Sequence, residues 1–275
     1  MKKESKRSTF HLIKEKNKKV KTALTIAGSD PSGGAGIQED LKVFTELGLH
    51  GLSVITTVTV QSSFGIRDAV SVEPGLIEDQ LQCLMEDTEP QAAKTGLLLE
   101  ESLPVVADFV KKAGFPVVVD TVFAAGSGLE LAEKKTVETY RKEIIPLGVI
   151  VTPNIPETET LLDMVIVDSR ILEGAARELI KMGANAVLIK GGHLDEEEVV
   201  DFFMDRSETR RFVKQRRGFK RVHGTGCTLS AAITAFLARG SSLADAVASA
   251  EAYIDRKLSD LIYPGKGTPV INHLP

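Results

Sequence analysis

The chain has 275 residues, of which 43% are hydrophobic and 26% charged, and it contains two Cys and no Trp. A chain of this length buries about three quarters of the surface that it exposes when unfolded, so it needs neither disulfides nor a structural metal to be stable. The 34 Lys+Arg and 38 Asp+Glu give a formal net charge of −4. This balance argues against a protein that binds nucleic acid over a broad surface, because such proteins carry an excess of positive charge.

Residues 1–21 differ in charge from the rest of the chain. They carry nine Lys/Arg and two Glu, so the remaining residues are net acidic. The segment has no apolar core and no small-residue cleavage site, which excludes a secretory signal, and no run approaches the ~20 apolar residues of a membrane span. A flexible, solvated tail is favoured over a segment that contacts RNA or lipid, because its lysines are not interleaved with aromatic residues. We expect neither nucleic acid nor membrane as a partner.

The two cysteines, Cys83 and Cys227, lie far apart in the sequence and do not form a disulfide framework. Free thiols of this kind are typical of a cytoplasmic protein.

From Thr22 onward, short β-rich segments alternate with segments of helical periodicity. Strands are predicted over 22–27, 52–60, 92–96, 115–120, 148–152 and 186–190, and the second of them is expected to be buried. Helices are predicted over 37–47, 74–88, 101–113, 130–143, 155–163 and 169–182, followed by an edge hairpin over 198–205 and 210–215 and by helices from Thr225 and from Leu243. This alternation predicts βαβ crossovers and a mainly parallel sheet. Because no repeat or linker interrupts it, a single domain over 22–275 is expected.

In open sheets of this kind, ligands bind outside the carboxyl ends of the strands. Most of the unusual residues of the chain follow predicted strands or precede predicted helices. They lie in segments 28–36, 94–97, 120–128, 152–157, 190–193 and 223–227 and at Gln61. The sequence therefore places the candidate site along this edge of the sheet.

Several common site motifs are absent from these segments. The glycine-rich loop GSDPSGGAG (28–36) lacks the Gly-Lys-Ser/Thr ending of a P-loop, and the third glycine of a dinucleotide fingerprint is replaced by Glu39. A tight turn and a ligand-binding loop stay equally open for this segment. His193 and His223 have no metal-ligand spacing, and no Gly-x-Ser-x-Gly motif is present. A zinc site or a serine hydrolase is therefore not expected.

The segment GTGC (224–227) opens a predicted helix with two glycines and a threonine. Free backbone N–H groups at such a helix start can bind one anion without a basic residue, which suits an acidic chain. Local sequence slightly favours the alternative, a helix start with a threonine cap and a small buried cysteine.

The segment TPNIPE (152–157) puts Asn154 and Glu157 three residues apart at a helix start. Two oxygen donors at this spacing can hold Mg²⁺ through water. The alternative is a capping box, and local sequence alone favours it.

Four segments together carry a family resemblance. They are ALTIAGSDPSGGAGIQEDLKVF (23–44), TPNIPETETLL (152–162), LIKGGHL (188–194) and HGTGCTLSAAI (223–233). In this order they resemble the hydroxymethylpyrimidine/phosphomethylpyrimidine kinases of thiamine biosynthesis, which belong to the ribokinase-like superfamily. The resemblance runs from about residue 22 to the GKG at 265–267 and leaves the basic tail outside.

The resemblance implies an α/β fold of ribokinase-like type, with a central, mostly parallel sheet flanked by helices on both faces, and a homodimer. It also implies an ATP- and Mg²⁺-dependent enzyme. Such an enzyme transfers the γ-phosphoryl group of ATP to 4-amino-5-hydroxymethyl-2-methylpyrimidine and then phosphorylates the monophosphate.

On the substrate side, the resemblance implies a pyrimidine pocket lined by Gly28, Asp40, Gln61, Leu97 and Val122. The carboxamide of Gln61 both donates and accepts hydrogen bonds, which matches a ring nitrogen beside an amino group. Leu97 stands where the family often has methionine, a volume-conserving difference.

On the phosphate side, the resemblance assigns a larger set of residues. Asn154 and Glu157 would hold Mg²⁺-ATP through water, Lys190 would lie near the transferred phosphate, Lys266 would contact the nucleotide, Gly224, Thr225 and Gly226 would form the anion hole, and Cys227 would be the general base. Because the positive end of a helix dipole favours a thiolate, we expect the pKa of Cys227 to be lowered.

The chain departs from the family pattern at Gly126 and at Lys220–Val222, both expected near the phosphates. Two alternative functions stay open: a pyridoxal/pyridoxine kinase of the same superfamily, and a pyrimidine-binding regulator that has lost turnover. The retained Asn154, Glu157 and Cys227 argue against the regulator.

Overall fold

The computed structural model describes residues 20–123, 133–218 and 221–274. The strands are β1 (Thr22–Ser29), β2 (His50–Ser62), β3 (Gly65–Ser71), β4 (Ala92–Thr95), β5 (Val117–Val119), β6 (Ile150–Val151), β7 (Val187–Ile189), β8 (Glu198–Met204), β9 (Thr209–Gln215), β10 (Leu261–Ile262) and β11 (Val270–Ile271). The helices are α1 (Gly36–Glu46), α2 (Pro74–Asp87), α3 (Leu103–Lys112), α4 (Lys134–Thr139), α5 (Ile155–Leu162), α6 (Leu172–Met182), α7 (Thr225–Ala238) and α8 (Leu243–Lys257). Within the described ranges, no helix is both long and apolar enough to cross a bilayer.

One nine-stranded sheet organises these elements, in the order β3-β2-β1-β4-β5-β6-β7-β8-β9. The six strands from β2 to β7 in this order are parallel to their neighbours, whereas β3 at one edge and β8 and β9 at the other are antiparallel. The predicted mainly parallel sheet and its edge hairpin are thereby confirmed. β10 and β11 form a small separate sheet that the sequence analysis did not predict.

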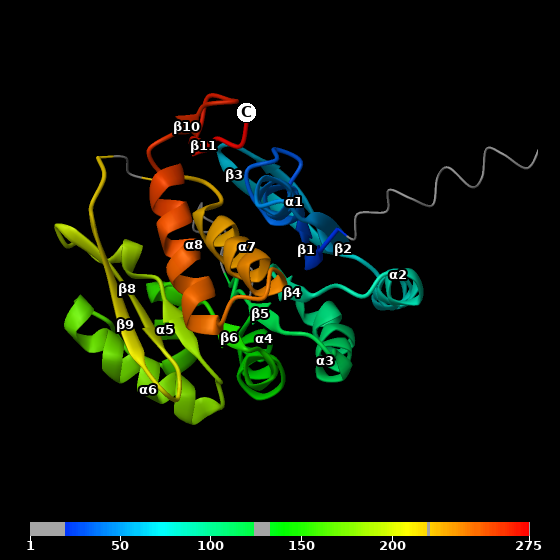
Figure 1. The fold of residues 1–275 in the computed structure, drawn as a ribbon, viewed down its shortest axis with the longest axis horizontal. Helices are drawn as coiled ribbons and strands as arrows, with labels where there is room; N and C mark the ends of the chain where they lie inside the picture. The colour runs from blue at the N-terminus through cyan, green and yellow to red at the C-terminus, as the bar shows by residue number, and fades with distance from the viewer. Residues whose placement is uncertain (1–19, 124–132, 219–220, 275) are drawn as a thin grey trace, which may run out of the picture.

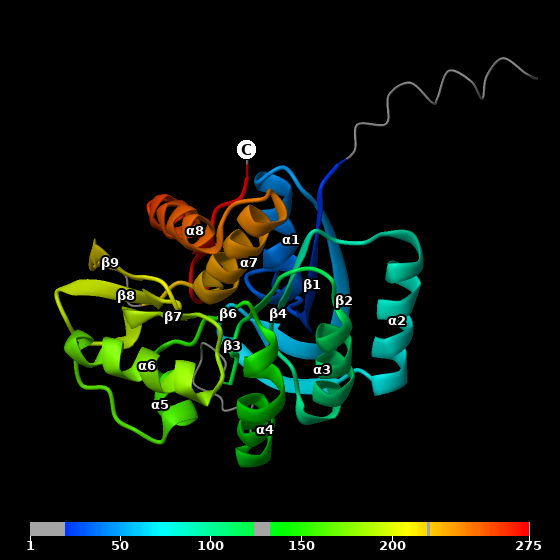
Figure 2. The ribbon, with the colours of Figure 1, turned by 60° about the horizontal axis from the view of Figure 1, so that its bottom comes forward.

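Helices cover both faces of the large sheet (Figures 1 and 2). On one face α1, α7 and α8 enclose a hydrophobic cluster that includes Phe44, Ile233 and Tyr253. On the other face α2 to α6 enclose a second cluster that includes Leu103 and Leu179. The sheet therefore buries both of its faces, as the near-continuous apolar runs of its central strands require.

Helix α6 shows how local sequence fixes an element. Its buried residues Leu172, Ala175, Ala176 and Leu179 recur at intervals of three and four and so form one apolar stripe. The helix ends at Gly183, whose φ of 122° favours glycine.

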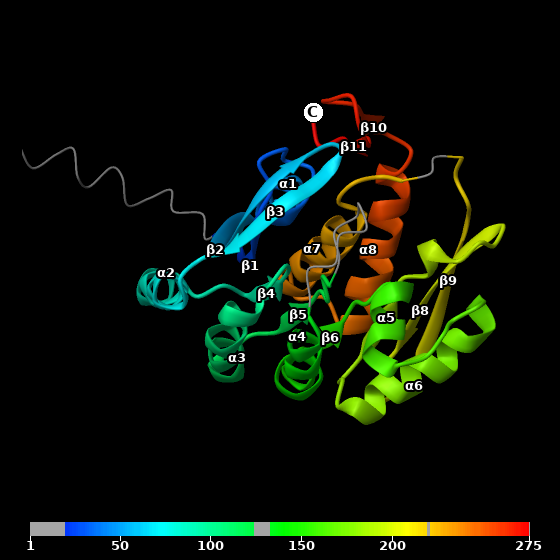
Figure 3. The same cartoon turned by 180° about the vertical axis from the view of Figure 1, so that it is seen from behind.

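The prediction of a buried strand over 52–60 is wrong for one face of its second half, because Thr57 and Thr59 are buried there but the valines between and after them are not. Val54 is fully buried, but Val58 and Val60 are each 54% exposed. Strand β2 continues beyond its parallel neighbour β1 and pairs with β3 as an antiparallel hairpin (Figure 3). β-Branched residues favour an extended backbone whether or not a second layer covers them, so the pattern indicated a strand without indicating its burial.

The predicted tail over 1–21 falls almost entirely outside the described residues. Its last residue, Lys21, belongs to the folded part, because its carbonyl oxygen accepts a hydrogen bond from the backbone N–H of His50 and its ammonium donates to the carbonyl of Arg239 at 2.7 Å. The departure from the family pattern at Gly126 also lies outside the described residues.

Candidate active site

A cleft of about 1560 Å³ runs along the carboxyl ends of the parallel strands. It is lined by Gly28–Asp30 at the end of β1, Gln61 in β2, Gly96 and Leu97 after β4, Asp120 and Val122 after β5, Asn154 after β6, Lys190 after β7 and Gly224–Cys227 at the start of α7. Every segment that the sequence analysis placed at this edge contributes to this one cleft. The predicted segments thus meet at one cleft, and its use as the active site stays a prediction.

The glycine-rich loop between β1 and α1 is a tight turn that also faces the cleft. Gly36 has φ 58°, and a Cβ at this position would lie 2.3 Å from the carbonyl oxygen of Gly28, so only glycine fits. The carboxylate of Asp30 accepts hydrogen bonds from the backbone N–H of Gly34 at 3.1 Å and of Ala35 at 2.9 Å. The tight turn is therefore confirmed, and ligand binding by this loop stays a prediction.

The N-terminus of α7 meets this loop. Gly224 has φ 83°, and a Cβ here would lie 1.9 Å from the carbonyl oxygen of Gly34. No side chain caps the helix, so the expected threonine cap is absent from this described helix start. Its first N–H groups have no intrahelical acceptor, and Thr225 and Gly226 line the cleft. This geometry suits an anion.

Lys190 brings a positive charge to the same helix start. Its ammonium lies 3.3 Å from the position of a Cβ on Gly226, 3.0 Å from Asp120 Oδ1 and 4.0 Å from Glu157 Oε2. Burial opposes the charged form, but Asp120 and Glu157 raise the pKa of Lys190, which is therefore a cation at neutral pH. Burial would raise the pKa of Asp120, yet the charges of Lys190 and Lys94 hold it below its usual value.

Asn154 and Glu157 form the capping box that was one of the two predicted readings. Asn154 Oδ1 accepts from the N–H of Glu157 at 2.9 Å, and Glu157 Oε2 accepts from the N–H of Asn154 at 2.7 Å. Burial raises the pKa of Glu157 to about 7; the charge of Lys190 opposes this shift and that of Asp120 adds to it.

Both side chains of the capping box also line the cleft, so the capping box does not exclude that they hold Mg²⁺ through water. Among the described residues no group of three His, Cys, Asp or Glu is arranged to hold a metal directly. The available donors are carboxylate and carboxamide oxygens, which fit Mg²⁺ held through water rather than a fully coordinated metal.

The expected lowering of the pKa of Cys227 is wrong. Burial raises the pKa of this thiol to about 12, although the charge of Lys94 and the backbone N–H of Gly36 act in the opposite direction. The helix dipole by itself would lower the pKa of Cys227, but the loss of water around the buried sulfur atom raises it by more.

The placement of Asp40 in the pocket wall also needs correction. Its carboxylate is fully buried behind the cleft, where it accepts hydrogen bonds from Lys94 at 2.9 and 3.0 Å and from Thr25 Oγ1 at 2.6 Å. Lys94 was not predicted as a site residue; it lies within a central strand, lines the cleft and interacts electrostatically with Cys227. A lysine in an otherwise apolar strand was the signal that could have identified it.

Gly28, Leu97, Val122 and Gln61 all line the cleft, as predicted. A side chain at position 28 would meet Leu97, because a Cβ there would lie 3.3 Å from Leu97 Cδ2. The amide nitrogen of Gln61 lies 2.7 Å from His223 Nε2, which is itself 3.1 Å from Asp30 Oδ2.

His223 thus joins the hairpin of β2 and β3 to the glycine-rich loop, a role that the sequence analysis missed. Lys266, by contrast, is exposed in the connection between β10 and β11 and does not line the cleft in the described structure. Its assignment to the nucleotide stays a prediction.

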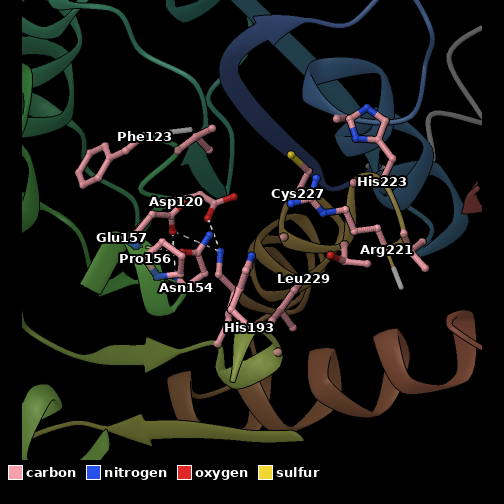
Figure 4. Close-up of a pocket in the computed structure, with 18 of the residues that line it drawn as sticks. Asp120, Phe123, Asn154, Pro156, Glu157, His193, Arg221, His223, Cys227 and Leu229 are labelled. Atoms are coloured by element: carbon pink, nitrogen blue, oxygen red, sulfur yellow. Dashed lines mark hydrogen bonds and ion pairs between the residues drawn. The ribbon is translucent and has the colours of Figure 1, made fainter. Parts of the chain in front are cut away.

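The labelled polar side chains lie on two sides of the cleft (Figure 4). Asp120, Asn154 and Glu157 lie together on one side, and Cys227 lies at the start of α7 on the other. Arg221, part of the departure at Lys220–Val222, also lines the cleft. The arrangement offers an anion site with a neighbouring lysine, next to a wall of apolar and carboxamide groups.

The family model for phosphomethylpyrimidine kinase matches residues 30–272. The chain belongs to this family. The hydroxymethylpyrimidine/phosphomethylpyrimidine kinase of Escherichia coli is 40% identical over 257 residues, covering 91% of this chain and 96% of that protein. A bifunctional thiamine biosynthesis protein of Geobacter sulfurreducens is 40% identical over 255 residues, and the match covers 92% of this chain but only 52% of that longer protein.

Solved structures of the family and of its neighbours have the same ribokinase-like fold. The phosphomethylpyrimidine kinase of Clostridium difficile has a TM-score of 0.77 and 36% identity, covering 86% of this chain and 99% of that chain. A pyridoxal kinase of Bacillus subtilis, solved with ADP, has a TM-score of 0.84 and 29% identity, covering 92% and 97%. The predicted fold class is confirmed.

Proposed function

We propose that this chain is an ATP-dependent kinase that phosphorylates 4-amino-5-hydroxymethyl-2-methylpyrimidine and then its monophosphate, in thiamine biosynthesis. The observation that carries the proposal is the meeting of the α7 N-terminus, Lys190 and Cys227 in a cleft whose wall contains Gln61. Family membership and relatives of nearly equal length named for this activity support it.

In this proposal the pyrimidine ring lies against Gly28, Leu97 and Val122, and its hydroxymethyl group faces Cys227. The N–H groups of Gly224, Thr225 and Gly226, with the Lys190 ammonium, stabilise the charge on the γ-phosphoryl group. The hydroxymethyl oxygen forms a bond to phosphorus as the bond to the ADP oxygen breaks, and Cys227 Sγ accepts the hydroxyl proton. Accepting a proton requires the thiolate; burial raises the pKa of Cys227 and so opposes this form, whereas the charge of Lys94 favours it.

Asn154 and Glu157 would hold Mg²⁺ through water beside the nucleotide, where the cation would neutralise phosphate charge. Oxygen donors that line the cleft next to Lys190 support this assignment.

The test is mass spectrometry of the products formed from the pyrimidine alcohol and ATP. We expect both the monophosphate and the diphosphate. A monophosphate alone would exclude the second phosphorylation. Binding without any phosphorylated product would favour the regulator instead.

A pyridoxal kinase is the second candidate, because pyridoxal kinases reach TM-scores of 0.84 with this chain. The chain is about 40% identical to pyrimidine kinases but only 29–30% identical to these pyridoxal kinases. This difference favours the pyrimidine as the substrate. Comparing kcat/KM for pyridoxal and for the pyrimidine alcohol separates the two.

We further propose that the enzyme is a cytoplasmic homodimer. Both cysteines are free thiols, which suits a reducing compartment. The β2–β3 hairpin exposes Val58, Val60 and Val70, each more than half exposed, and paired positions put Val58 next to Val70. A second copy of the chain would cover this apolar face.

Changing Val60 to lysine should then yield a monomer, because a buried unpaired charge opposes association. Sedimentation velocity measures the state, and Val165→Lys, at an exposed valine on another surface, is the control. A dimer that persists in the Val60 variant would exclude this face as the interface.

A further inference from the structure

The carboxylate of Glu39 is fully buried behind Gly224, the residue that precedes α7. Its Oε1 accepts a hydrogen bond from Thr228 Oγ1 at 2.7 Å, and a Cβ on Gly224 would lie 3.5 Å from its Cγ. Glu39 also lies in the first turn of α1, beside the positive end of the helix dipole. A negative charge therefore lies directly behind the helix start that would receive a phosphoryl group.

Such a charge opposes the binding of an anion unless a cation neutralises it. Lys42 is one candidate, but its ammonium is 3.6 Å from Glu39 Oε2, its side chain is 41% exposed, and it donates a hydrogen bond to the carbonyl of Gly33. Water screens an exposed charge of this kind. The second candidate comes from the other end of the chain.

His273, two residues from the C-terminus, places Nε2 2.7 Å from Glu39 Oε1 and Nδ1 2.7 Å from Glu46 Oε2. A carboxylate oxygen only accepts hydrogen bonds, so an imidazole ring that donates to both glutamates carries a hydrogen on each nitrogen, which is the imidazolium form. The side chain is 5% exposed, which removes most of the screening.

The segment that carries His273 is held to the rest of the fold by three sets of hydrogen bonds, one of them to His223 in the cleft. Strand β11 pairs with β10, the carbonyl of Pro269 accepts from the N–H of His223 at 2.9 Å, and the carbonyl of Asn272 accepts from Lys257 at 2.8 Å. Figure 1 shows this end of the chain beside α1.

We propose that His273 is a positioning residue for phosphoryl transfer: its imidazolium neutralises Glu39 and so keeps the α7 N-terminus attractive to the phosphates of ATP. The inference rests on the proposed kinase function. It assigns to the C-terminal segment a part in the active site although no atom of His273 lines the cleft in the described structure.

The test compares His273→Gln, which keeps a hydrogen-bond donor but has no charge, with the double variant Glu39→Gln/His273→Gln. We expect the single variant to lose kcat/KM for ATP roughly 10- to 30-fold, the size expected for a buried charge at an effective dielectric constant of about 20. The KM for the pyrimidine should change little. The double variant should recover most of the loss, because the charge that repels the anion is gone.

His50→Ala, at an exposed histidine at the start of β2, is the matched control and should behave as the unchanged protein. A double variant as impaired as His273→Gln, or a fully active His273→Gln, would overturn the proposal. If the single variant does not fold, a folded and active double variant supports it and an inactive one overturns it.

Calorimetric titration with AMP-PCP provides a readout that needs no acceptor. Weaker AMP-PCP binding in His273→Gln, restored in the double variant, supports the proposal even if the unchanged protein phosphorylates no pyrimidine. A failure of the unchanged protein to phosphorylate the pyrimidine would overturn the proposed function but not the role of His273.

Discussion

At the scale of single residues, Gln61 and Cys227 both line the cleft, and the proposed function gives each a separate role in the reaction. Gln61 contacts His223, and Cys227 lies near Lys94. In the proposed function Gln61 holds the pyrimidine ring and Cys227 accepts the proton.

Gln61→Ala should raise KM for the pyrimidine alcohol roughly 10-fold or more and KM for ATP much less, because a site built to pair with a polar ring discriminates strongly once a partner is lost. Steady-state kinetics with each substrate varied in turn gives both constants. Equal changes in the two constants would place Gln61 outside the pyrimidine pocket.

Cys227→Ala should lower kcat by about 10²–10⁴, the usual contribution of a general base, while binding of ATP and pyrimidine persists. Cys227→Asp should recover part of the loss if proton transfer is the role. The control is Cys83→Ala, at an exposed position on α2. An active Cys227→Ala enzyme would leave the N–H groups of α7 as the main catalytic element.

At the scale of elements, α5 begins with a capping box whose glutamate also reaches the cleft. Under the proposed function the same side chain serves both stability and catalysis, and a substitution has to separate the two roles.

Glu157→Gln keeps an oxygen that can accept the N–H of Asn154, so the capping box survives. We expect an unchanged melting temperature, a lower kcat and a higher Mg²⁺ requirement. Glu157→Ala, its companion variant, should additionally lose about 1 kcal/mol of stability through the cap. Normal kinetics in Glu157→Gln at every Mg²⁺ concentration would reduce Glu157 to a capping residue.

At the scale of the whole molecule, a buried ion cluster joins α8 to the edge hairpin. Lys214 on β9 contacts Asp201 on β8 at 3.1 Å and also Glu251 on α8. One cation between two buried carboxylates leaves excess negative charge. Burial, together with Asp201, raises the pKa of Glu251 to about 8 despite the opposing charge of Lys214.

A raised pKa in the folded state means that the native protein keeps a proton that the unfolded chain has already lost. Between the ordinary value of 4.5 and about 8, the free energy of unfolding should therefore fall as the pH rises. Glu251→Gln should flatten this dependence. Urea unfolding at pH 5.5, 6.5 and 8 (roughly spanning that window) measures it, with the exposed Glu86→Gln as control. An identical slope in Glu251→Gln and the unchanged protein would contradict the assignment.

The sequence by itself determined the alternation of strands and helices, because apolar periodicity and glycine positions are local properties. From the alternation followed the parallel sheet, and from the sheet the edge at which the cleft lies. Only the tertiary structure decided which residues meet there. Lys94 pairs with Asp40 from 54 residues away, and His273 reaches Glu39 from 234 residues away. Burial and charge pairing depend on such distant partners. The exposure of Val58 and Val60 on β2 and the raised pKa of Cys227 could therefore not be predicted from local sequence.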